Sequence, residues 1–376
     1  MKKKKILLTY LSFGSGHKAV CNYIKRYFED HSKQYEIEAI DILEYSNDMF
    51  VNSQQKMYNF ISLQFPILWN SVYYGFNNRL VTLANTLPRF FMYNKKLRNK
   101  VKDFNPDLVI STHYYSSYLI QRMILKKEID TKLITIVTDY DRHRIWMAGS
   151  KVEDAVMVAC EDTKKFFIKK KMNKDLVHEI GGVPVYPNHD ENFNPDEVKK
   201  LFEHPEYPLC LFFGGGTNGN KRSIAYLEEA LNSNLKINII YVAGKNEKAK
   251  NHVDKLIEEN GYTNAIALGF ITNNGDYFEM SDFVVSKPGG LQTTEALLYN
   301  KPMMMILSSG GQENYNLRFL EREHYGKYFR NPNSFAKYLK EISDDNNIIK
   351  EYHENIKNNS SNTAMEQLFK YVNETI

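Results

Sequence analysis

The chain has 376 residues, of which 43% are hydrophobic and 25% are charged, with 19 glycines and 11 prolines. At roughly 150 residues per domain, this length predicts two or three globular domains, and the composition excludes collagen-like, low-complexity and mostly disordered chains. The net charge is only +4, and the three cysteines are far apart, so the sequence indicates neither a disulfide framework nor a zinc site and fits a reducing cytosol.

The N-terminal half alternates predicted strands with predicted helices. Ile6–Leu11 is an apolar run that is too short for an export signal and predicts a buried strand. It ends at the glycine turn 14–16, and apolar residues at helical spacing from Ala19 to Phe28 predict an amphipathic helix. Further strands are expected at 36–42, 107–112, 132–138 and 154–159, with helices such as 116–127 and 162–171 between them. This alternation predicts a parallel sheet with helices on both faces.

The segment 49–102 has an unusual charge pattern. It contains no Asp or Glu, but it has eight Lys or Arg residues and eleven aromatic residues. Its uncharged part, 57–78, includes Pro66 and several amide side chains, so it is a poor candidate for a membrane-spanning helix. We expect an interfacial helix on an anionic membrane, the alternative being a solvated helix face over core aromatics. The residues expected to make this contact are Trp69, Arg89, Phe90, Phe91, Lys95, Lys96 and Arg98.

The second half repeats the alternation. Strands are expected at 209–213, 237–243, 283–286 and 303–307, and helices at 247–260, 292–299 and 313–324. The fold class is therefore α/β, with two doubly wound Rossmann-like domains whose ligands bind at the carboxyl ends of the strands, facing a central cleft. The predicted divisions are an N-terminal domain at 1–185, a linker at 186–205, a C-terminal domain at 206–345 and a last helical segment, 346–376, packing back on the N-terminal domain.

The turn after the first strand offers two interpretations. Gly14–Ala19 fits the G-x-G-x-x-A dinucleotide fingerprint, with Asp41 after the second strand, so binding of NAD is one interpretation. The other depends on His17, because an imidazole at a helix N-terminus is kept neutral by the helix dipole and can accept a proton. A histidine that only caps the helix is the structural alternative.

Two later turns also suggest ligand sites. The run 214–221 resembles a phosphate-binding P-loop, but Asn220 separates the last glycine from Lys221, so an ATPase is excluded while a ligand role stays open. The run 286–295, SKPGGLQTTE, is more informative: a strand ends, two glycines follow, and a helix begins with two hydroxyls near its start. Such a helix N-terminus is suited to a diphosphate. Asp139 and Asp141 spell DxD, a weak signal for a divalent ion on a diphosphate.

Together these motifs resemble those of the diacylglycerol glycosyltransferases of glycosyltransferase family 28. The resemblance runs nearly end to end. It is carried by FGSGH at 13–17, VTDY at 137–140 with His143 and Trp146, GVPV at 182–185, the glycines 214–216, Gly269-Phe270, the run 286–295, and GQE at 311–313 with Asn316. It implies the two-domain GT-B fold, a nucleotide-sugar donor on the C-terminal domain and a lipid acceptor on the N-terminal domain.

The resemblance also implies roles for individual residues. His17 would be the acceptor's base, Asp139 would orient the histidine or lie on the acceptor side, and Tyr140, His143 and Trp146 would lie near the acceptor or the membrane. The backbone of Gly269-Phe270 would read uracil, and Glu295 would bind the ribose. The full expected donor set is Gly16, Gly215, Gly216, Thr217, Gly269, Phe270, Lys287, Gly289, Gly290, Leu291, Thr293, Thr294, Glu295, Gln312, Glu313 and Asn316.

The expected function is inverting transfer of glucose or galactose from a UDP-sugar to diacylglycerol or a glycosyl-diacylglycerol. The resemblance implies a reaction without a metal or other cofactor, on a protein attached peripherally to the inner face of the cell membrane. No nucleic-acid partner is expected, since no binding motif accompanies the basic residues. The alternatives are a peptidoglycan-type N-acetylglucosaminyl transferase, an NAD-dependent oxidoreductase and a non-catalytic UDP-sugar sensor.

Overall fold

The computed structural model describes residues 3–12, 16–45, 75, 77, 95–140, 142–147, 151–215, 220–308 and 310–376. Several residues with an expected role lie outside this part of the chain: Trp69, Arg89, Phe90, Phe91, Gly216 and Thr217. Asp141, to which the resemblance gives no role, also lies outside it. The described chain divides into two compact units, residues 1–186, 309–315 and 361–376 in the first and residues 187–308 and 316–360 in the second.

The first unit is a six-stranded parallel sheet with the strand order β2-β1-β3-β4-β5-β6. Its buried apolar strands form because such a sheet is covered on both faces. The strands are β1 Lys4–Tyr10, β2 Tyr35–Asp41, β3 Leu108–Ser111, β4 Lys132–Ile136, β5 Ala155–Val158 and β6 Val177–Glu179. The helices are α1 Gly16–His31, η1 Ile42–Tyr45, α5 Lys95–Phe104, α6 Tyr114–Leu125, η3 Arg144–Met147, α7 Glu161–Lys169, η4 Lys174–Leu176 and α16 Ala364–Thr375.

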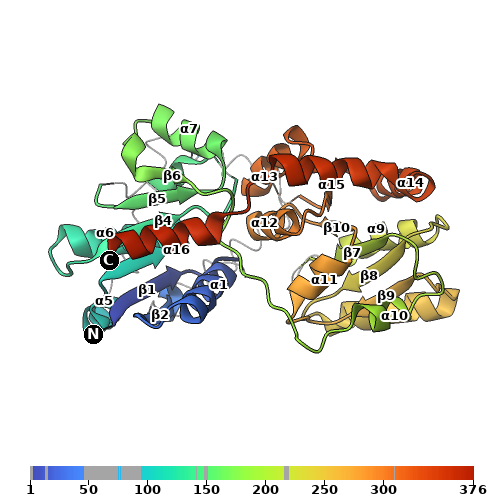
Figure 1. Ribbon diagram of the computed structural model, residues 1–376, viewed down its shortest axis with the longest axis horizontal. Coiled ribbons are helices and arrows are strands. Elements are labelled where there is room, and N and C mark those ends of the chain that lie inside the picture. The colour runs from blue at the N-terminus through green and yellow to red at the C-terminus, as the bar shows by residue number, and fades with distance from the viewer. Residues whose placement is uncertain are drawn as a thin grey trace. The chain divides into compact units, whose positions relative to one another are not determined.

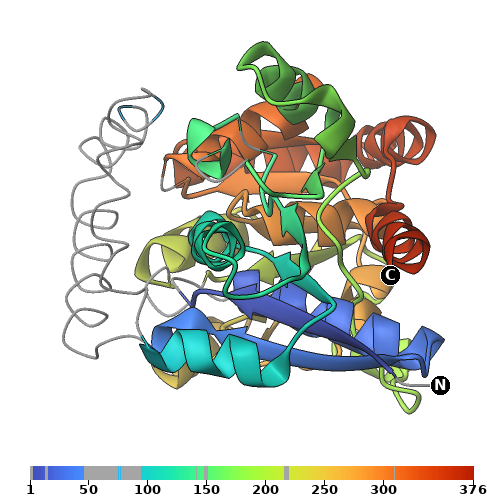
Figure 2. The same ribbon diagram turned by 90° about the vertical axis from the view of Figure 1, so that its left-hand side faces the viewer.

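Helices cover both faces of this first sheet (Figures 1 and 2). On one face α5 and α6 bury Leu97, Val101 and Leu119 against β1, β3 and β4, while Phe167 of α7 packs on β5. On the other face α16 lies beside α1, and Phe369 contacts Phe28 with a ring-centroid distance of 4.9 Å. The C-terminal helix therefore completes the hydrophobic core of the first unit.

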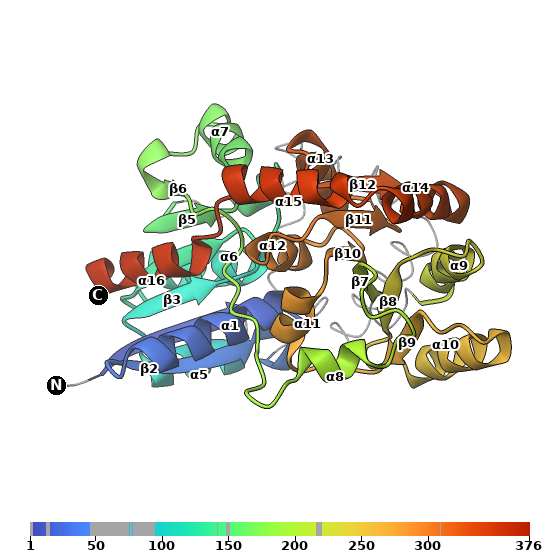
Figure 3. The same cartoon turned by 45° about the vertical axis from the view of Figure 1, so that its right-hand side comes forward.

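The second unit is another six-stranded parallel sheet, with the order β12-β11-β10-β7-β8-β9. Its strands are β7 Leu209–Phe213, β8 Asn238–Val242, β9 Ala265–Leu268, β10 Phe283–Ser286, β11 Met303–Ile306 and β12 Gly326–Phe329. Its helices are α8 Pro195–Lys199, α9 Asn220–Leu231, α10 Glu247–Asn260, α11 Asn274–Met280, α12 Gly290–Leu298, α13 Gln312–Arg322, α14 Pro332–Asp344 and α15 Asn347–Asn359, as Figure 3 shows. The division between the units falls within α13.

Two segments near the expected boundaries make contacts that the sequence did not indicate. The expected linker 186–205 begins as a docked segment: Gly275 N donates to Asn188 O at 2.9 Å, and Asp190 N donates to Asp276 Oδ2 at 2.9 Å. These bonds fix it to α11 of the second unit. The expected segment 346–376 is divided, because α15 buries Ile349 in the second unit's core and only residues 361–376 belong to the first unit.

Candidate active site

In the first unit, strand order identifies the position of a site. From β1 the chain passes through α1 to β2 on one side, whereas from β3 it passes through α6 to β4 on the other side. The neighbouring strands β1 and β3 therefore form a topological switch point, where the connections leave a crevice at the carboxyl ends. His17 follows β1, and Thr112 and His113 follow β3, so the switch point brings together residues that are 95 apart in sequence.

The Thr112 backbone fixes the His17 ring. The Nδ1 atom of His17 lies 2.7 Å from the Thr112 carbonyl oxygen, and the hydroxyl of Thr112 donates back to the carbonyl of His17 at 3.2 Å. Because a carbonyl oxygen only accepts, Nδ1 must carry the proton of the neutral ring. The unprotonated nitrogen is then Nε2, the atom available to accept a proton from a substrate.

The surroundings of His17 favour this neutral form. Burial of the ring lowers the pKa of His17 from 6.5 to about 4, because desolvation penalises the imidazolium, while the Thr112 hydrogen bond acts in the opposite direction. The Thr138 hydroxyl also lies 3.2 Å from Nδ1. His17 is therefore a neutral imidazole throughout the physiological range of pH.

A second imidazole lies beside His17. The ring of His113 meets the ring of His17 edge to face, with a centroid distance of 4.7 Å. His113 caps α6, and its Nδ1 accepts a hydrogen bond from Tyr115 N at 3.0 Å. None of the sequence motifs pointed to His113, although a polar Thr-His pair at the end of a predicted strand is the signal that could have identified it.

The second unit has an equivalent switch point between β7 and β10. From β7 the chain passes through α9 to β8, and from β10 it passes through α12 to β11, in opposite directions along the sheet. After β7, Gly215 has φ +84°, a left-handed conformation that favours glycine, and a Cβ at Gly214 would lie 2.3 Å from the Tyr241 hydroxyl. After β10 comes the N-terminus of α12, with Gly289 as its N-cap.

The start of α12 combines backbone donors with an unused hydroxyl. Its N-cap, Gly289, has no side chain that could cap the helix, and the first N–H groups of a helix without such a cap can bind an anion. Within the first turns of the helix, the Thr294 hydroxyl donates to Gly290 O at 3.2 Å. The Thr293 hydroxyl, in contrast, is fully buried and finds no hydrogen-bond partner among the described residues.

Neighbouring side chains hold this turn in place. Ser286 donates to Gln292 Oε1, and the buried Asn316 of α13 donates to Pro288 O at 2.9 Å. Glu295 is 6% exposed, and its Oε1 accepts from Asn274 Nδ2 at 2.9 Å. Of the other expected donor residues, Gln312 and Glu313 lie in the first turn of α13.

The residues expected to bind uracil lie at the β9 edge of this sheet. Gly269 and Phe270 follow β9, and the Phe270 side chain is 62% exposed. Lys245, in the turn after β8, holds its ammonium 5.1 Å from the Phe270 ring centre. An exposed aromatic ring at the carboxyl end of a strand provides a flat face for a base.

Known proteins resemble this chain over most of its length. Residues 17–185 match the family model of monogalactosyldiacylglycerol (MGDG) synthase, and residues 209–368 match the glycosyltransferase family 28 C-terminal domain. The chain is 23% identical to the processive diacylglycerol beta-glucosyltransferase of Staphylococcus carnosus, covering 93% of this chain and 87% of that protein. It is 24% identical to the Bacillus subtilis protein of the same name, covering 98% and 95%. Over most of its length, the chain therefore resembles the diacylglycerol glycosyltransferases of glycosyltransferase family 28. It is a glycosyltransferase that uses a UDP-sugar.

Solved structures show the fold of this glycosyltransferase. Acinetobacter baumannii MurG matches with a TM-score of 0.64 at 12% identity, covering 99% of both chains. The Anabaena protein Alr3699/HepE, solved in complex with UDP and glucose, matches with a TM-score of 0.57 at 13% identity over 99% of this chain and all of that chain. The glycosyltransferase therefore has the GT-B fold, as the sequence motifs implied.

The expected acceptor-side residues of the glycosyltransferase lie inside the first unit. Tyr140, His143 and Trp146 are at most 5% exposed. His143 accepts from Ile145 N at 3.1 Å, and Trp146 packs edge to face on Tyr114 at 5.9 Å. These contacts hold the loop after β4 against the core of the unit, and Asp139 belongs to the same loop.

Only part of the basic segment is available on α5. Arg98 and Lys102 lie 2.7 and 3.5 Å from Glu128, and Lys100 pairs with Glu38. Lys95 and Lys96 are exposed at the start of the helix. Among the described residues, no helix of the glycosyltransferase is both long and apolar enough to span a bilayer.

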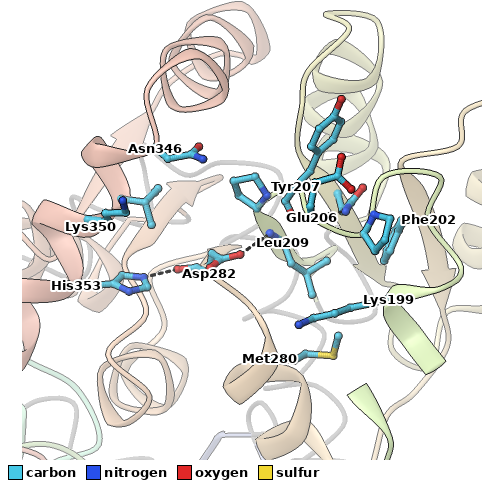
Figure 4. A pocket seen from close by; sticks show the side chains of 14 residues that line it. Lys199, Phe202, Glu206, Tyr207, Leu209, Met280, Asp282, Asn346, Lys350 and His353 are labelled. Carbon is cyan, nitrogen blue, oxygen red and sulfur yellow. Dashed lines mark hydrogen bonds between the residues drawn. The ribbon is translucent and has the colours of Figure 1, made fainter. Parts of the chain in front are cut away.

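A cavity of about 420 Å³ opens elsewhere in the second unit, at the amino ends of the strands (Figure 4). Leu209 and Asn238 begin β7 and β8 there, and His353 donates to the backbone oxygen of Asp282, just before β10, at 2.6 Å. The start of α12 follows the opposite, carboxyl end of β10. This cavity therefore contains none of the expected donor residues.

Proposed function

We propose that this glycosyltransferase moves a glucose or galactose residue from a UDP-sugar to diacylglycerol or a glycosyl-diacylglycerol, with inversion at the anomeric carbon. The observation that carries the proposal is the fixed tautomer of His17, because it leaves Nε2 as a neutral base at the switch point of the first unit. The names of the relatives support the lipid acceptor, and the UDP complexes of proteins with the same fold support the donor.

The proposed reaction is a single displacement. Nε2 of His17 accepts the proton of the acceptor hydroxyl as its oxygen forms a bond to the anomeric carbon. The bond between that carbon and the diphosphate breaks, and its electron pair goes to the departing diphosphate oxygen. The amides at the start of α12 stabilise this charge. The step uses protein groups alone and needs no metal or other cofactor.

In this proposal the other donor-binding residues have the roles that the family resemblance implies. Glu295 binds the ribose hydroxyls, the Gly269-Phe270 backbone reads uracil, and Gln312 and Glu313 hold the sugar hydroxyls. Asn316 supports the diphosphate turn through its bond to Pro288 O. The enzyme works while attached to the cytoplasmic face of a membrane, through basic residues that include Lys95 and Lys96.

The test is a transfer assay. Purified protein is incubated with radiolabelled UDP-glucose or UDP-galactose and vesicles containing diacylglycerol, and the lipids are separated by chromatography. We expect label in a glycosyl-diacylglycerol that appears with one donor more than with the other. Transfer only from UDP-N-acetylglucosamine, or binding of UDP-sugars with no transfer to any lipid, would contradict the proposal.

A further inference from the structure

A second basic surface lies on α7, away from the segment that the sequence analysis assigned to the membrane. Six lysines occur between residues 164 and 174: Lys164, Lys165, Lys169, Lys170, Lys171 and Lys174. The acidic residues in and next to this segment are Glu161, Asp162 and Asp175. Glu161 lies 3.9 Å from Lys165, and Asp162 lies 3.9 Å from Arg142, so these pairs leave an excess of positive charge.

The lysines share their helix face with apolar side chains. Thr163 and Phe167 point into the core, whereas Lys165 and Lys169 lie on the opposite face and are exposed. Ile168, between them in sequence, is 38% exposed. Phe166 is partly exposed, with the Lys170 ammonium 5.6 Å from its ring centre. Exposed aliphatic and aromatic groups surrounded by lysines are typical of helices that lie in a lipid interface.

This face differs from α5 in how its charge is compensated. On α5, Arg98 and Lys102 share Glu128 and Lys100 pairs with Glu38, so three of its five cations are paired within the unit. On α7, the 3.9 Å contact of Lys165 with Glu161 is the one ion pair of a lysine within the described part of the chain. The α7 lysines are therefore available to an external anion.

The α7 helix is also joined to the acceptor side of the candidate active site. Phe167 packs in the same hydrophobic cluster as Val137 and Trp146, which belong to the loop after β4. Arg142 of that loop lies 3.9 Å from Asp162 in the first turn of α7. An external surface bound by α7 would therefore lie beside the loop that contains Asp139 and Tyr140.

We propose that the α7 lysine face, with Ile168 inserted among the headgroups, docks on an anionic membrane surface. This inference rests on the proposed function, in which the acceptor is a membrane lipid. Charge complementarity selects the partner, because lysines next to an anionic bilayer strengthen binding about fivefold each. The exposed aliphatic group favours a lipid surface over a nucleic acid, whose backbone offers no apolar layer.

The test compares two triple variants of the full-length chain. The first variant removes three exposed lysines of this surface, two in α7 and one in η4, through Lys165→Gln, Lys169→Gln and Lys174→Gln. The second variant is the control and removes three exposed lysines from α10 and α14 through Lys248→Gln, Lys255→Gln and Lys337→Gln. Each protein is sedimented with phosphatidylglycerol-containing vesicles in about 0.1 M salt. We expect the α7 variant to partition on the order of 100-fold more weakly. The control should match the unmodified protein, and equal partitioning of both variants would overturn the proposal.

An assay with a soluble acceptor distinguishes a failure of this inference from a failure of the proposed function. With a short-chain diacylglycerol in solution, the α7 variant should transfer sugar at the unmodified rate, since its lysines touch neither donor nor acceptor hydroxyl. If the unmodified protein transfers nothing to this acceptor, the proposed function fails while vesicle binding still tests docking. If the unmodified protein ignores anionic vesicles but shifts duplex DNA in a lysine-dependent manner, the membrane assignment is wrong.

Discussion

At the scale of single residues, the chemistry of the first unit depends on one backbone carbonyl. Thr112 O fixes Nδ1 of His17 as the protonated nitrogen, and burial keeps the ring neutral. The neighbouring His113 is itself fixed, because its Nδ1 accepts from Tyr115 N. Two imidazoles with defined tautomers therefore lie edge to face at the carboxyl ends of β1 and β3.

The first prediction concerns the pH dependence of transfer. The pKa of His17 is lowered from 6.5 to about 4, so the base stays unprotonated as the pH falls from 8 to about 5 and is lost through protonation below that. The acid limb of kcat/KM for a soluble acceptor should therefore lie near pH 4 to 5. His17→Ala should lower kcat by 10² to 10⁴ while UDP affinity is kept. Normal turnover in this variant would remove His17 from the role of base.

A second prediction concerns His113, whose edge contact aligns the His17 ring. His113→Ala should lower kcat about 10-fold with little change in the KM of the donor, since a misaligned base is less effective. His113→Asn should recover part of the loss, because an asparagine at the N-cap can still accept from Tyr115 N. An unchanged kcat in both variants would show that His113 only caps α6.

The third prediction concerns a buried carboxyl that the reaction does not use. Glu153 accepts from Thr135 and Ser117 at 2.5 and 3.0 Å, and burial raises its pKa from 4.5 to about 7. Because the folded pKa is raised, its contribution to stability is complete below pH 4.5 and is lost as the pH rises to about 7. A shift of this size is on the order of 3 kcal/mol.

Glu153→Gln tests this linkage. Glutamine keeps an oxygen for Thr135 and Ser117 but cannot ionise, so the decrease in unfolding free energy between pH 5 and pH 8 should become smaller. Urea unfolding at both pH values measures the difference, and Glu161→Gln on the exposed face of α7 is the matched control. Equal pH dependence in the two variants would mean that Glu153 does not cause it.

At the scale of elements, the start of α12 is held in place by bonds within the second unit. Asn316 and Gln292 fix the turn around Pro288, and Glu295 is held by Asn274. Within this fixed frame the Thr293 hydroxyl is buried without a partner among the described residues. A buried unpaired hydroxyl costs about 1 to 3 kcal/mol, which a ligand that pairs with it would recover.

The fourth prediction follows from that hydroxyl. Thr293→Val removes an unpaired group, so the unliganded protein should keep or gain unfolding free energy, while UDP affinity should decrease about 10-fold if the hydroxyl serves the nucleotide. Thr294→Val is the comparison for stability, since its hydroxyl donates to Gly290 O and its loss should cost about 1 kcal/mol of unfolding free energy. Thermal unfolding and UDP titration measure both effects. Unchanged UDP affinity in Thr293→Val would exclude a binding role.

The sequence predicted the elements well because buried parallel strands are apolar runs and their helices have a clear period. It also located His17 and the 286–295 turn, since local patterns define a helix N-terminus. His113 was missed because its importance arises only when β1 and β3 become neighbours. Tyr140, His143 and Trp146 were expected near the acceptor, and sequence alone could not show that all three are buried, Trp146 in a cluster with Phe167 and Tyr114.

At the scale of the whole molecule, the chain returns to its first unit after completing the second. Residues 361–376 add α16 to the core of the first unit, where Leu368 is fully buried and Phe369 contacts Phe28. No local pattern separates α15 from α16 by unit, because both are amphipathic helices. The division follows from which core receives each apolar face.

The last prediction uses this division. Leu368→Ala in α16 and Leu339→Ala in α14 each truncate a fully buried side chain, at a cost of 2 to 5 kcal/mol in their own unit. Trp146 is buried in the first unit, so its fluorescence reports the unfolding of that unit. With a urea slope of about 2 to 3 kcal/mol/M, Leu368→Ala should lower the fluorescence midpoint by about 1 M. Leu339→Ala should leave it unchanged and lower only the transition seen by circular dichroism. If both variants shift one coincident transition, the two units unfold together, and the return of α16 couples their stability.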